Sequence, residues 1–472
     1  MTGTVVAAIL VPMGVGALLF IARRIGGWVR GGLTLATVLA ACGSVGLLWV
    51  QSGGVSHGLA YFGIIKVDPA PLLLVDPVGL VLAALFCFVW LLVTVYSLQY
   101  LKDYPFQNDY YGFFLIMLGA VIGLCFSQNL VMTYLFWEMA GVATWRLVAF
   151  FRGEREVAVA QKTLLINFVG SVLMLVGFAM VFVEQGTVTL SDLAGGRLST
   201  PSALLVLAGI VTKSASLPFY IWLPDAHTVA PSPMSALLSG IVAKIGLVVY
   251  LRFFVQAGLE LPYWLPYLVA GIGVGGSLIA AGCAMRENDY KRLLALSTVS
   301  QLGYIFIGFA LAGGYGATAG LVYLVAHCIA KAGLFMAMGA VEQATHKRDL
   351  RQLGGLLRVM PVTGVAVAVL ALSVIGLPPF LGFFGKFYVV LAAVRENLLV
   401  AIGALVAAVM TAFYMLRLYR MFVGEPREPV AVPRQGAMVA MVAVAAVVTL
   451  GLGLAFAHLS GYLGQWLSAS GL

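Results

Sequence analysis

Charged residues are scarce in this sequence of 472 residues. Asp, Glu, Lys and Arg make up only 10% of the chain, whereas hydrophobic residues make up 62%. Too few polar side chains are present to cover the surface that a water-soluble protein of this length would expose. The scarcity of charge therefore excludes a water-soluble protein and indicates one whose solvent is the lipid bilayer.

Patterns that ligate cofactors are also lacking. The cysteines stand singly within apolar runs, without the CxxC spacing of iron–sulfur or zinc sites. No glycine-rich fingerprint for a flavin or a nicotinamide is present either. We therefore expect no cofactor and no metal in this chain, and we interpret the cysteines as packing residues: Cys42, Cys87, Cys125, Cys283 and Cys328.

Long apolar runs fill most of the sequence and predict an all-α polytopic membrane protein. Most are 18 to 27 residues long, which suits α-helices that cross about 30 Å of hydrocarbon, whereas barrel strands would alternate over about ten residues. The first run starts at Thr4 without a basic segment before it, so we expect a spanning helix there and no cleaved signal peptide. About 14 spans are predicted, at residues 4–22, 31–50, 77–98, 110–127, 129–151, 157–184, 201–224, 231–255, 262–284, 290–314, 315–341, 360–392, 397–422 and 436–458.

Two of these spans combine a proline break with a lysine. In the seventh, SLPF follows Lys213, and in the twelfth, GLPPFLGFFG precedes Lys386. Irregular backbone at membrane depth is tolerated where it lines a cavity. Spans four to eight and nine to thirteen each number five, so two such units in tandem must have opposite topology. We therefore predict two inverted five-helix repeats with helices 7 and 12 broken, in a chain divided into 1–108 (an N-terminal three-helix segment), 109–256 (the first repeat), 257–424 (the second repeat) and 425–472 (a C-terminal helix and tail).

The basic residues are distributed unevenly between the two sides of this arrangement. Of the 27 Lys and Arg residues, nineteen fall in loops and helix ends on one side, and four fall on the other: Lys66, Arg197, Arg252 and Arg395. Because cytoplasmic loops carry the positive excess, both termini are predicted on the non-cytoplasmic side. The bias also accounts for the net charge of +9, so we do not attribute that charge to nucleic-acid binding.

Five charged residues lie deep inside predicted spans: Glu138, Lys213, Lys244, Lys331 and Lys386. Each would cost roughly 2.5 to 3.5 kcal/mol if it faced lipid, so we expect all five to face the protein interior. Glu138 and Lys213 lie at similar depths and are predicted to meet across a helix interface. A carboxylate favours the protonated form of a buried lysine, so a change in their separation would load or unload a proton. A static pair that only fixes helix packing is the alternative.

Further polar residues extend this line. Tyr323, His327 and Lys331 recur every four residues and share one helix face, which indicates a relay or, alternatively, a satisfied core histidine. Two polar stripes either hold water or join helices by hydrogen bonds: Ser297, Ser300, Gln301 and Tyr304 in the tenth span, and Thr163, Asn167 and Ser171 in the sixth.

Five segments carry a resemblance to a known family. They are LFWEMAG (135–141), TKSASLPFYIWLPDAHTVAPSPMSALLSGIVAKIG (212–246), NDYKRLLALSTVSQLGYI (288–305), AHCIAKAGLF (326–335) and GLPPFLGFFGKFYV (376–389). The chain resembles the antiporter-like, proton-translocating membrane subunits shared by respiratory complex I, energy-converting membrane-bound hydrogenases and Mrp-type cation/proton antiporters. The resemblance implies a fourteen-helix core with a hydrated central axis.

The resemblance also implies roles for individual residues. The matching positions form a proton relay: Glu138, Lys213, Lys244, His327, Lys331 and Lys386. Asp225 and His227 match the loop after the seventh helix, where they serve either a cytoplasmic entrance or a helix cap. Arg146 departs from the Ser-Tyr pair of many complex I members and either adjusts the charge near Glu138 or anchors its helix at the membrane surface.

Several functions fit these residues. The main prediction is a proton-translocating subunit of a redox-driven complex in the inner membrane, with other membrane subunits, an antiporter-like paralogue, a redox arm and the lipid bilayer as partners, and no nucleic acid. The alternatives are a subunit of an Mrp-type sodium/proton antiporter, an energising subunit for inorganic-carbon uptake, and a structural or quinone-binding scaffold.

Overall fold

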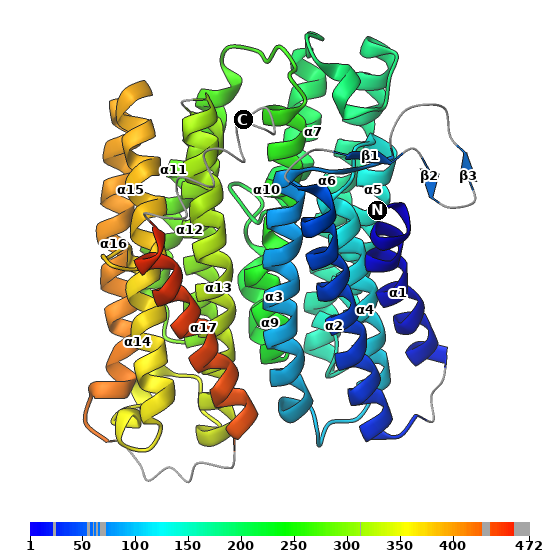
Figure 1. The fold of residues 1–472 in the computed structure, drawn as a ribbon. Coiled ribbons are helices and arrows are strands. Elements are labelled where there is room, and N and C mark those ends of the chain that lie inside the picture. The colour runs from blue at the N-terminus through cyan, green and yellow to red at the C-terminus, as the bar shows by residue number, and fades with distance from the viewer. Residues whose placement is uncertain are drawn as a thin grey trace.

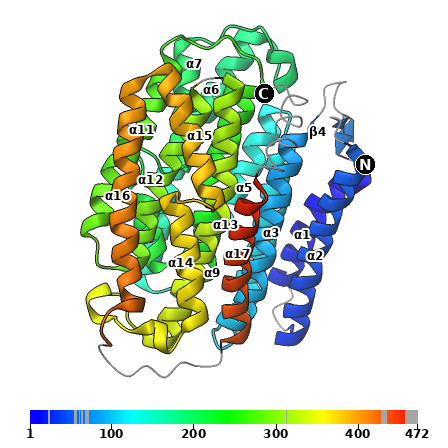
Figure 2. The same cartoon turned by 60° about the vertical axis from the view of Figure 1, so that its left-hand side comes forward.

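The computed structural model describes residues 1–21, 25–53, 57–59, 61–62, 65–66, 72–311, 313–426 and 435–456. Helices run side by side in one bundle, with α1 and α2 at one edge and α11 and α16 at the opposite edge in both views (Figures 1 and 2). The helices are α1 (Thr2–Ile21), α2 (Gly27–Ser52), α3 (Pro77–Tyr100), α4 (Gln107–Cys125), α5 (Leu130–Val148), α6 (Glu154–Gln185), α7 (Thr200–Lys213), α8 (Trp222–Val229), α9 (Ser232–Gly240), α10 (Ile245–Tyr250), α11 (Leu265–Arg286), α12 (Tyr290–Ala310), α13 (Gly313–Thr345), α14 (Pro361–Ile375), α15 (Leu381–Glu396), α16 (Leu398–Val423) and α17 (Gly436–Leu454).

Three spans form the centre of the bundle. The spanning helices differ in how many residues of an 18-residue apolar window are buried. All of them are buried in the span Ser232–Gln256 and 94% in α12 and α13, but only 33% in α1, α2 and α16. The outer helices instead expose apolar side chains such as Leu18, Leu47 and Phe413, as lipid-facing helices do. Charged residues on the central spans are therefore kept from lipid by a layer of other helices.

Eleven helices among the described residues are long and apolar enough to cross a membrane, judged by length and composition. The other predicted crossings correspond to α5 and to two interrupted segments, α7 with α8 and α14 with α15. The polytopic helical class is confirmed, whereas the count of fourteen and the inverted repeats stay predictions. The predicted C-terminal segment 425–472 is described only at 425–426 and 435–456.

Both predicted proline breaks are present. Helix α7 ends at Lys213, before the SLPF segment, and helical structure resumes at Trp222. The indole Nε1 of Trp222 donates to the carbonyl of Thr212 at 3.0 Å and so satisfies part of the broken helix end. Helix α14 ends at Ile375, and Gly376 (φ 90°) turns the chain in a conformation that favours glycine.

A third irregularity was not predicted. The span 231–255 was expected to be one helix, but α9 ends at Gly240, and the chain continues through a 3₁₀ turn (η2, Val242–Lys244), α10 and a π-helical turn (η3, Leu251–Gln256). No proline lies at this break. The Nζ of Lys244 instead donates to the carbonyl of Ser239, which would otherwise accept the next helical bond.

Arg252 lies in η3 rather than in the loop to which it had been assigned. The side chain is buried, and its two terminal nitrogens donate to the two carboxylate oxygens of Asp76 at 2.7 and 2.6 Å. Asp76 also accepts the backbone N–H of Gly79 as the N-cap of α3. The pair joins the start of α3 to the end of the span Ser232–Gln256.

The all-α prediction also missed two small antiparallel sheets. Strand β1 (His57–Leu59) pairs with β4 (Leu73–Val75), and β2 (Tyr61–Phe62) pairs with β3 (Ile65–Lys66). Strands this short lack the run of alternating residues by which a strand is recognised.

Candidate functional site

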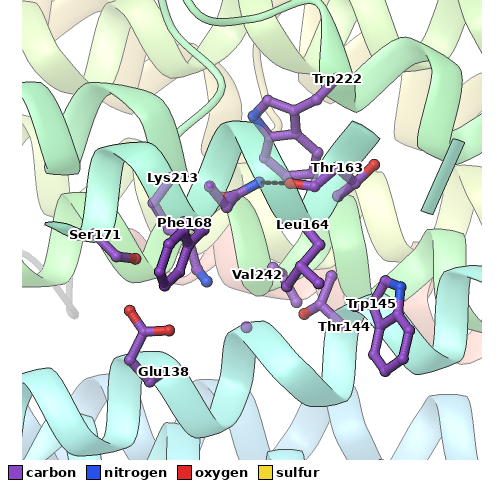
Figure 3. Close-up of a pocket in the computed structure, with 12 residues that line it drawn as sticks. Glu138, Thr144, Trp145, Thr163, Leu164, Phe168, Ser171, Lys213, Trp222 and Val242 are labelled. Carbon is purple, nitrogen blue, oxygen red and sulfur yellow. Dashed lines mark hydrogen bonds between the residues drawn. The ribbon is translucent and has the colours of Figure 1, made fainter. Parts of the chain in front are cut away.

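Glu138 and Lys213 lie on opposite sides of one small cavity. Helix α5 carries Glu138, and α7 ends at Lys213, so that the two side chains point toward one another (Figure 3). The cavity has a volume of about 20 Å³, which is room for a water molecule. Its lining is partly polar: Glu138, Gly141, Thr144, Trp145, Thr163, Leu164, Asn167, Phe168, Ser171, Lys213, Trp222 and Val242.

The two charges approach without closing into an ion pair. Among the described residues, no ion pair within 4.0 Å joins Glu138 to Lys213, and the buried Oε1 of Glu138 has no hydrogen-bond partner. The Nζ of Lys213 lies 5.3 Å from the ring centroid of Trp137 and 3.2 Å from the position that a Cβ on Gly141 would occupy. Gly141 follows Glu138 by one helical turn. The pair is therefore open, with a space that water can fill.

The predicted polar stripe of the sixth span lines this cavity. Thr163, Asn167 and Ser171 lie on α6, where Ser171 accepts a hydrogen bond from the indole of Trp137 at 2.9 Å. The Oδ1 of Asn167 is buried without a partner. Unsatisfied polar atoms around a water-sized space favour hydration over helix joining for this stripe.

The stripe on α12 instead joins helices. Gln301 donates to Thr411 at 3.1 Å and to Tyr414 at 2.8 Å, both on α16. Ser300 exchanges hydrogen bonds with the backbone and side chain of Ser277 on α11. These bonds fix α12 between its neighbours, which is the helix-joining role of polar residues in membranes.

Lys244 and Lys331 are both buried in the centre of the bundle. Lys244 is fully buried and bonded to Ser239, whose hydroxyl lies 2.7 Å from that of Thr298 on α12. One residue before Thr298, Ser297 accepts a hydrogen bond from the Nζ of Lys331 at 2.6 Å, and the carbonyl of Leu294 accepts another at 2.8 Å. Hydroxyl groups of α12 therefore bond both to Lys331 and to Ser239, the residue that holds Lys244.

His327 lies one helical turn before Lys331 on the same face of α13. It is 1% exposed, and neither ring nitrogen has a hydrogen-bond partner among the described residues. A buried imidazole with two free nitrogens is suited to accept a proton from one neighbour and donate it to another.

Lys386 occupies the second break. Its Nζ donates to the carbonyls of Val374 at 2.8 Å and Ile375 at 3.3 Å, which the end of α14 leaves without helical partners. The same ammonium lies 4.6 Å from the ring centroid of Tyr304 and 5.6 Å from that of Tyr323. Backbone dipoles and aromatic faces thus stabilise its charge.

Asp225 and His227 lie in helix α8 rather than in a loop. Asp225 pairs with Lys162 at 2.7 Å and Arg292 at 2.9 Å, while the N-cap residue Ile221 makes no capping bond, so the capping interpretation is wrong. His227 is fully buried, stacks on Phe335 at 4.2 Å between ring centroids, and has two unpartnered ring nitrogens.

A second buried ion pair, besides that of Asp76 with Arg252, was not predicted. The Nζ of Lys291, at the start of α12, is fully buried and lies 2.7 Å from Oε2 of Glu342. Arg348 donates to the other oxygen of that carboxylate at 2.6 Å. Glu342 follows Lys331 by eleven residues, or about three helical turns, and this spacing on one face was a signal for a shared polar path.

A helical membrane bundle with a buried row of lysines, a glutamate and a histidine defines an antiporter-like membrane protein. Residues 127–411 match the family described as "NADH:quinone oxidoreductase/Mrp antiporter, TM". The chain belongs to this family, as the resemblance implied.

Individual relatives come from different branches. The chain is 35% identical to a Na(+)/H(+) antiporter subunit of Alkalihalophilus pseudofirmus over 74% of its own length and 48% of the relative's. It is 33% identical to NAD(P)H-quinone oxidoreductase chain 5 of a Picosynechococcus strain over 75% of its own length and 56% of the relative's. The chain thus spans about half the length of the curated relatives it matches.

A solved structure shows the same fold over nearly its whole length. The similarity to a chain of the membrane-bound sulfane sulfur reductase, an archaeal respiratory membrane complex, has a TM-score of 0.88 at 22% identity and covers 99% of this chain and 97% of that one. At this identity the similarity concerns the fold alone.

Proposed function

We propose that the chain is a proton-translocating subunit of a multisubunit membrane complex. The single observation that carries the proposal is the open pair of Glu138 and Lys213 across a water-sized cavity. A closed ion pair would only hold the two helices together. In an open pair, the proton affinity of Lys213 depends on how far away Glu138 lies.

The proposed relay runs from Glu138 and Lys213 through the buried groups of the central helices to Lys386. When Glu138 moves toward Lys213, it favours the ammonium form, and when it withdraws, the buried lysine tends to lose its proton. The proton passes through Lys244 and the hydroxyls of α12 to Lys331 and His327. It leaves by Lys386, which is itself held by the free carbonyls of α14.

Two kinds of complex fit the proposal equally. The identity to the Na(+)/H(+) antiporter relative supports a sodium/proton antiporter, and that to the quinone oxidoreductase chain supports a redox-driven complex. We propose a place in the cytoplasmic membrane with both termini outside the cytoplasm, and contacts with further membrane subunits, among them a paralogue and, in the redox case, an electron-transferring arm.

The test is the substitution Glu138→Gln in the assembled complex, with proton transport measured in inverted vesicles by the quenching of a pH-sensitive dye. Transport is expected to fall by about 100-fold, the scale on which a proton-transferring group contributes. The matched control is Glu154→Gln, which changes an exposed glutamate at the start of α6 and is expected to leave transport unchanged. Native gels monitor assembly. Wild-type transport by an assembled Glu138→Gln complex contradicts the proposal.

A further inference from the structure

A second cavity lies where α1, α2, α4 and α5 approach one end of the bundle. Its volume is about 710 Å³, and three arginines line it: Arg30 from α2, Arg146 from α5 and Arg152 from the turn after α5. The relay described above uses none of them. All three belong to the side of the chain where basic residues are in excess.

The positive charges of this cavity exceed its negative ones. Asp109 pairs with Arg146 at 3.2 Å and also with Arg152, so one carboxylate is shared by two guanidinium groups. Among the described residues, Arg30 has only neutral partners, the side-chain oxygens of Asn108 and Gln107, and its buried Nε has none. The cavity therefore has two positive charges that no acidic side chain of its lining compensates.

The backbone at its rim is held in an unusual conformation. Phe106 and Arg152 both have positive φ, 62° and 59°, although neither is glycine. The guanidinium of Arg152 lies 3.5 Å from the centroid of the Phe106 ring, so the two residues hold each other in place. Residues kept in the left-handed region by their surroundings gather at ligand-binding sites.

Apolar side chains form part of the wall beside the arginines, and the same helices carry exposed apolar side chains. Phe20, Phe113 and Trp145 line the cavity. Beyond it, α1 exposes Leu18 and α5 exposes Val142, the latter at 46%. A ligand with an anionic head and long apolar chains has a complementary surface here, whereas a small free anion would leave the apolar side chains uncovered.

We propose that this cavity binds the phosphate group of an anionic phospholipid. Guanidinium groups suit phosphate because they donate paired, charge-assisted hydrogen bonds. With the orientation inferred above, the cavity faces the cytoplasmic leaflet, where basic pockets between helices bind anionic headgroups. Trp145 also lines the Glu138 cavity, so the lipid headgroup lies one side chain away from the relay.

The experiment measures binding of phosphatidylglycerol to the full chain in phosphatidylcholine nanodiscs by native mass spectrometry. Arg30→Gln and Arg152→Gln are each expected to weaken binding about fivefold, because one arginine near a membrane surface contributes about that factor. Arg152→Lys keeps the charge but loses the paired guanidinium donors, so its affinity is expected to lie between that of the wild type and that of Arg152→Gln. The matched control is Arg395→Gln. It removes a guanidinium that lies 4.8 Å from the ring centroid of Tyr315 and that the sequence assigns to the other side of the membrane.

A second arm distinguishes the source of the phosphate. Inorganic phosphate, added in solution to nanodiscs of phosphatidylcholine alone, is expected not to bind measurably. Saturable phosphate binding that Arg30→Gln removes would overturn the lipid assignment, as would equal lipid binding by all variants. Crosslinking of this cavity, in the intact complex, to an acidic segment of another subunit would likewise overturn it.

Discussion

The two proline breaks hold their lysines in different ways. At the first, Lys213 faces Glu138 across a water-sized cavity, with an aromatic ring beside it. At the second, Lys386 donates to two carbonyls of the broken helix and lies over two tyrosine rings. No acidic side chain pairs with Lys386 among the described residues.

This difference separates a movable partner from a fixed one. A carboxylate on another helix changes its distance when that helix shifts, and the proton affinity of the lysine follows. The carbonyls that accept from Lys386 belong to the same interrupted segment as the lysine. They move with it, so their electrostatic effect on its ammonium group stays nearly constant. If the proposed relay operates, the proton affinity is therefore set at the first break, and the second break only passes the proton on.

The largest expected effect is a difference in stability between the variants Lys386→Met and Lys213→Met. Lys386→Met leaves the carbonyls of Val374 and Ile375 without donors, which costs about 1 to 3 kcal/mol per buried group. Lys213→Met leaves no bonded carbonyl unsatisfied but removes the opposite charge that faces Glu138 across the cavity, so a smaller loss of stability is expected. Thermal unfolding in detergent measures both. A larger loss for Lys213→Met would reverse the comparison.

A smaller effect is expected when only the spacing of the open pair changes. In Gly141→Ala, the new Cβ would lie 3.2 Å from the Nζ of Lys213 and push the flexible ammonium away by a few tenths of an ångström. Transport is expected to fall severalfold while the fold is retained. The control is Gly46→Ala on α2, where no atom lies within 4 Å of the new Cβ. Unchanged transport in Gly141→Ala would show that the gap is not finely set.

The smallest effect concerns a charge outside the membrane spans. Hydrogen bonds from Arg351 lower the pKa of Asp349, which caps the short turn η4 (Leu350–Gln352). Because the folded-state pKa is depressed, this stabilisation is present at neutral pH and is lost as the pH falls through the folded-state pKa. Asp349→Asn is expected to lower the melting temperature slightly at pH 7 and not at all in strong acid. An equal loss at every pH would assign the effect to the cap alone.

The sequence was informative where a local rule fixes the chain. Prolines near Lys213 and Lys386 predicted both breaks, and the cost of a charge in lipid predicted that Glu138 faces inward. It was uninformative at the break after Gly240, where a lysine side chain, not a proline, replaces the helical bond. Burial of Arg252 and the pairing of Lys291 with Glu342 depend on residues more than 50 positions away, which no local pattern contains.

The pair of Asp76 and Arg252 has a mechanical consequence. Two parallel hydrogen bonds, out of contact with water, fasten the far end of the central span to the start of α3. A regular helix that is anchored at one end changes its length or twist most easily where its hydrogen-bond pattern is interrupted. Within the described part of Ser232–Gln256, the helix is interrupted from Gly240 to Lys244. A displacement along this span is therefore expected to change the backbone beside Lys244.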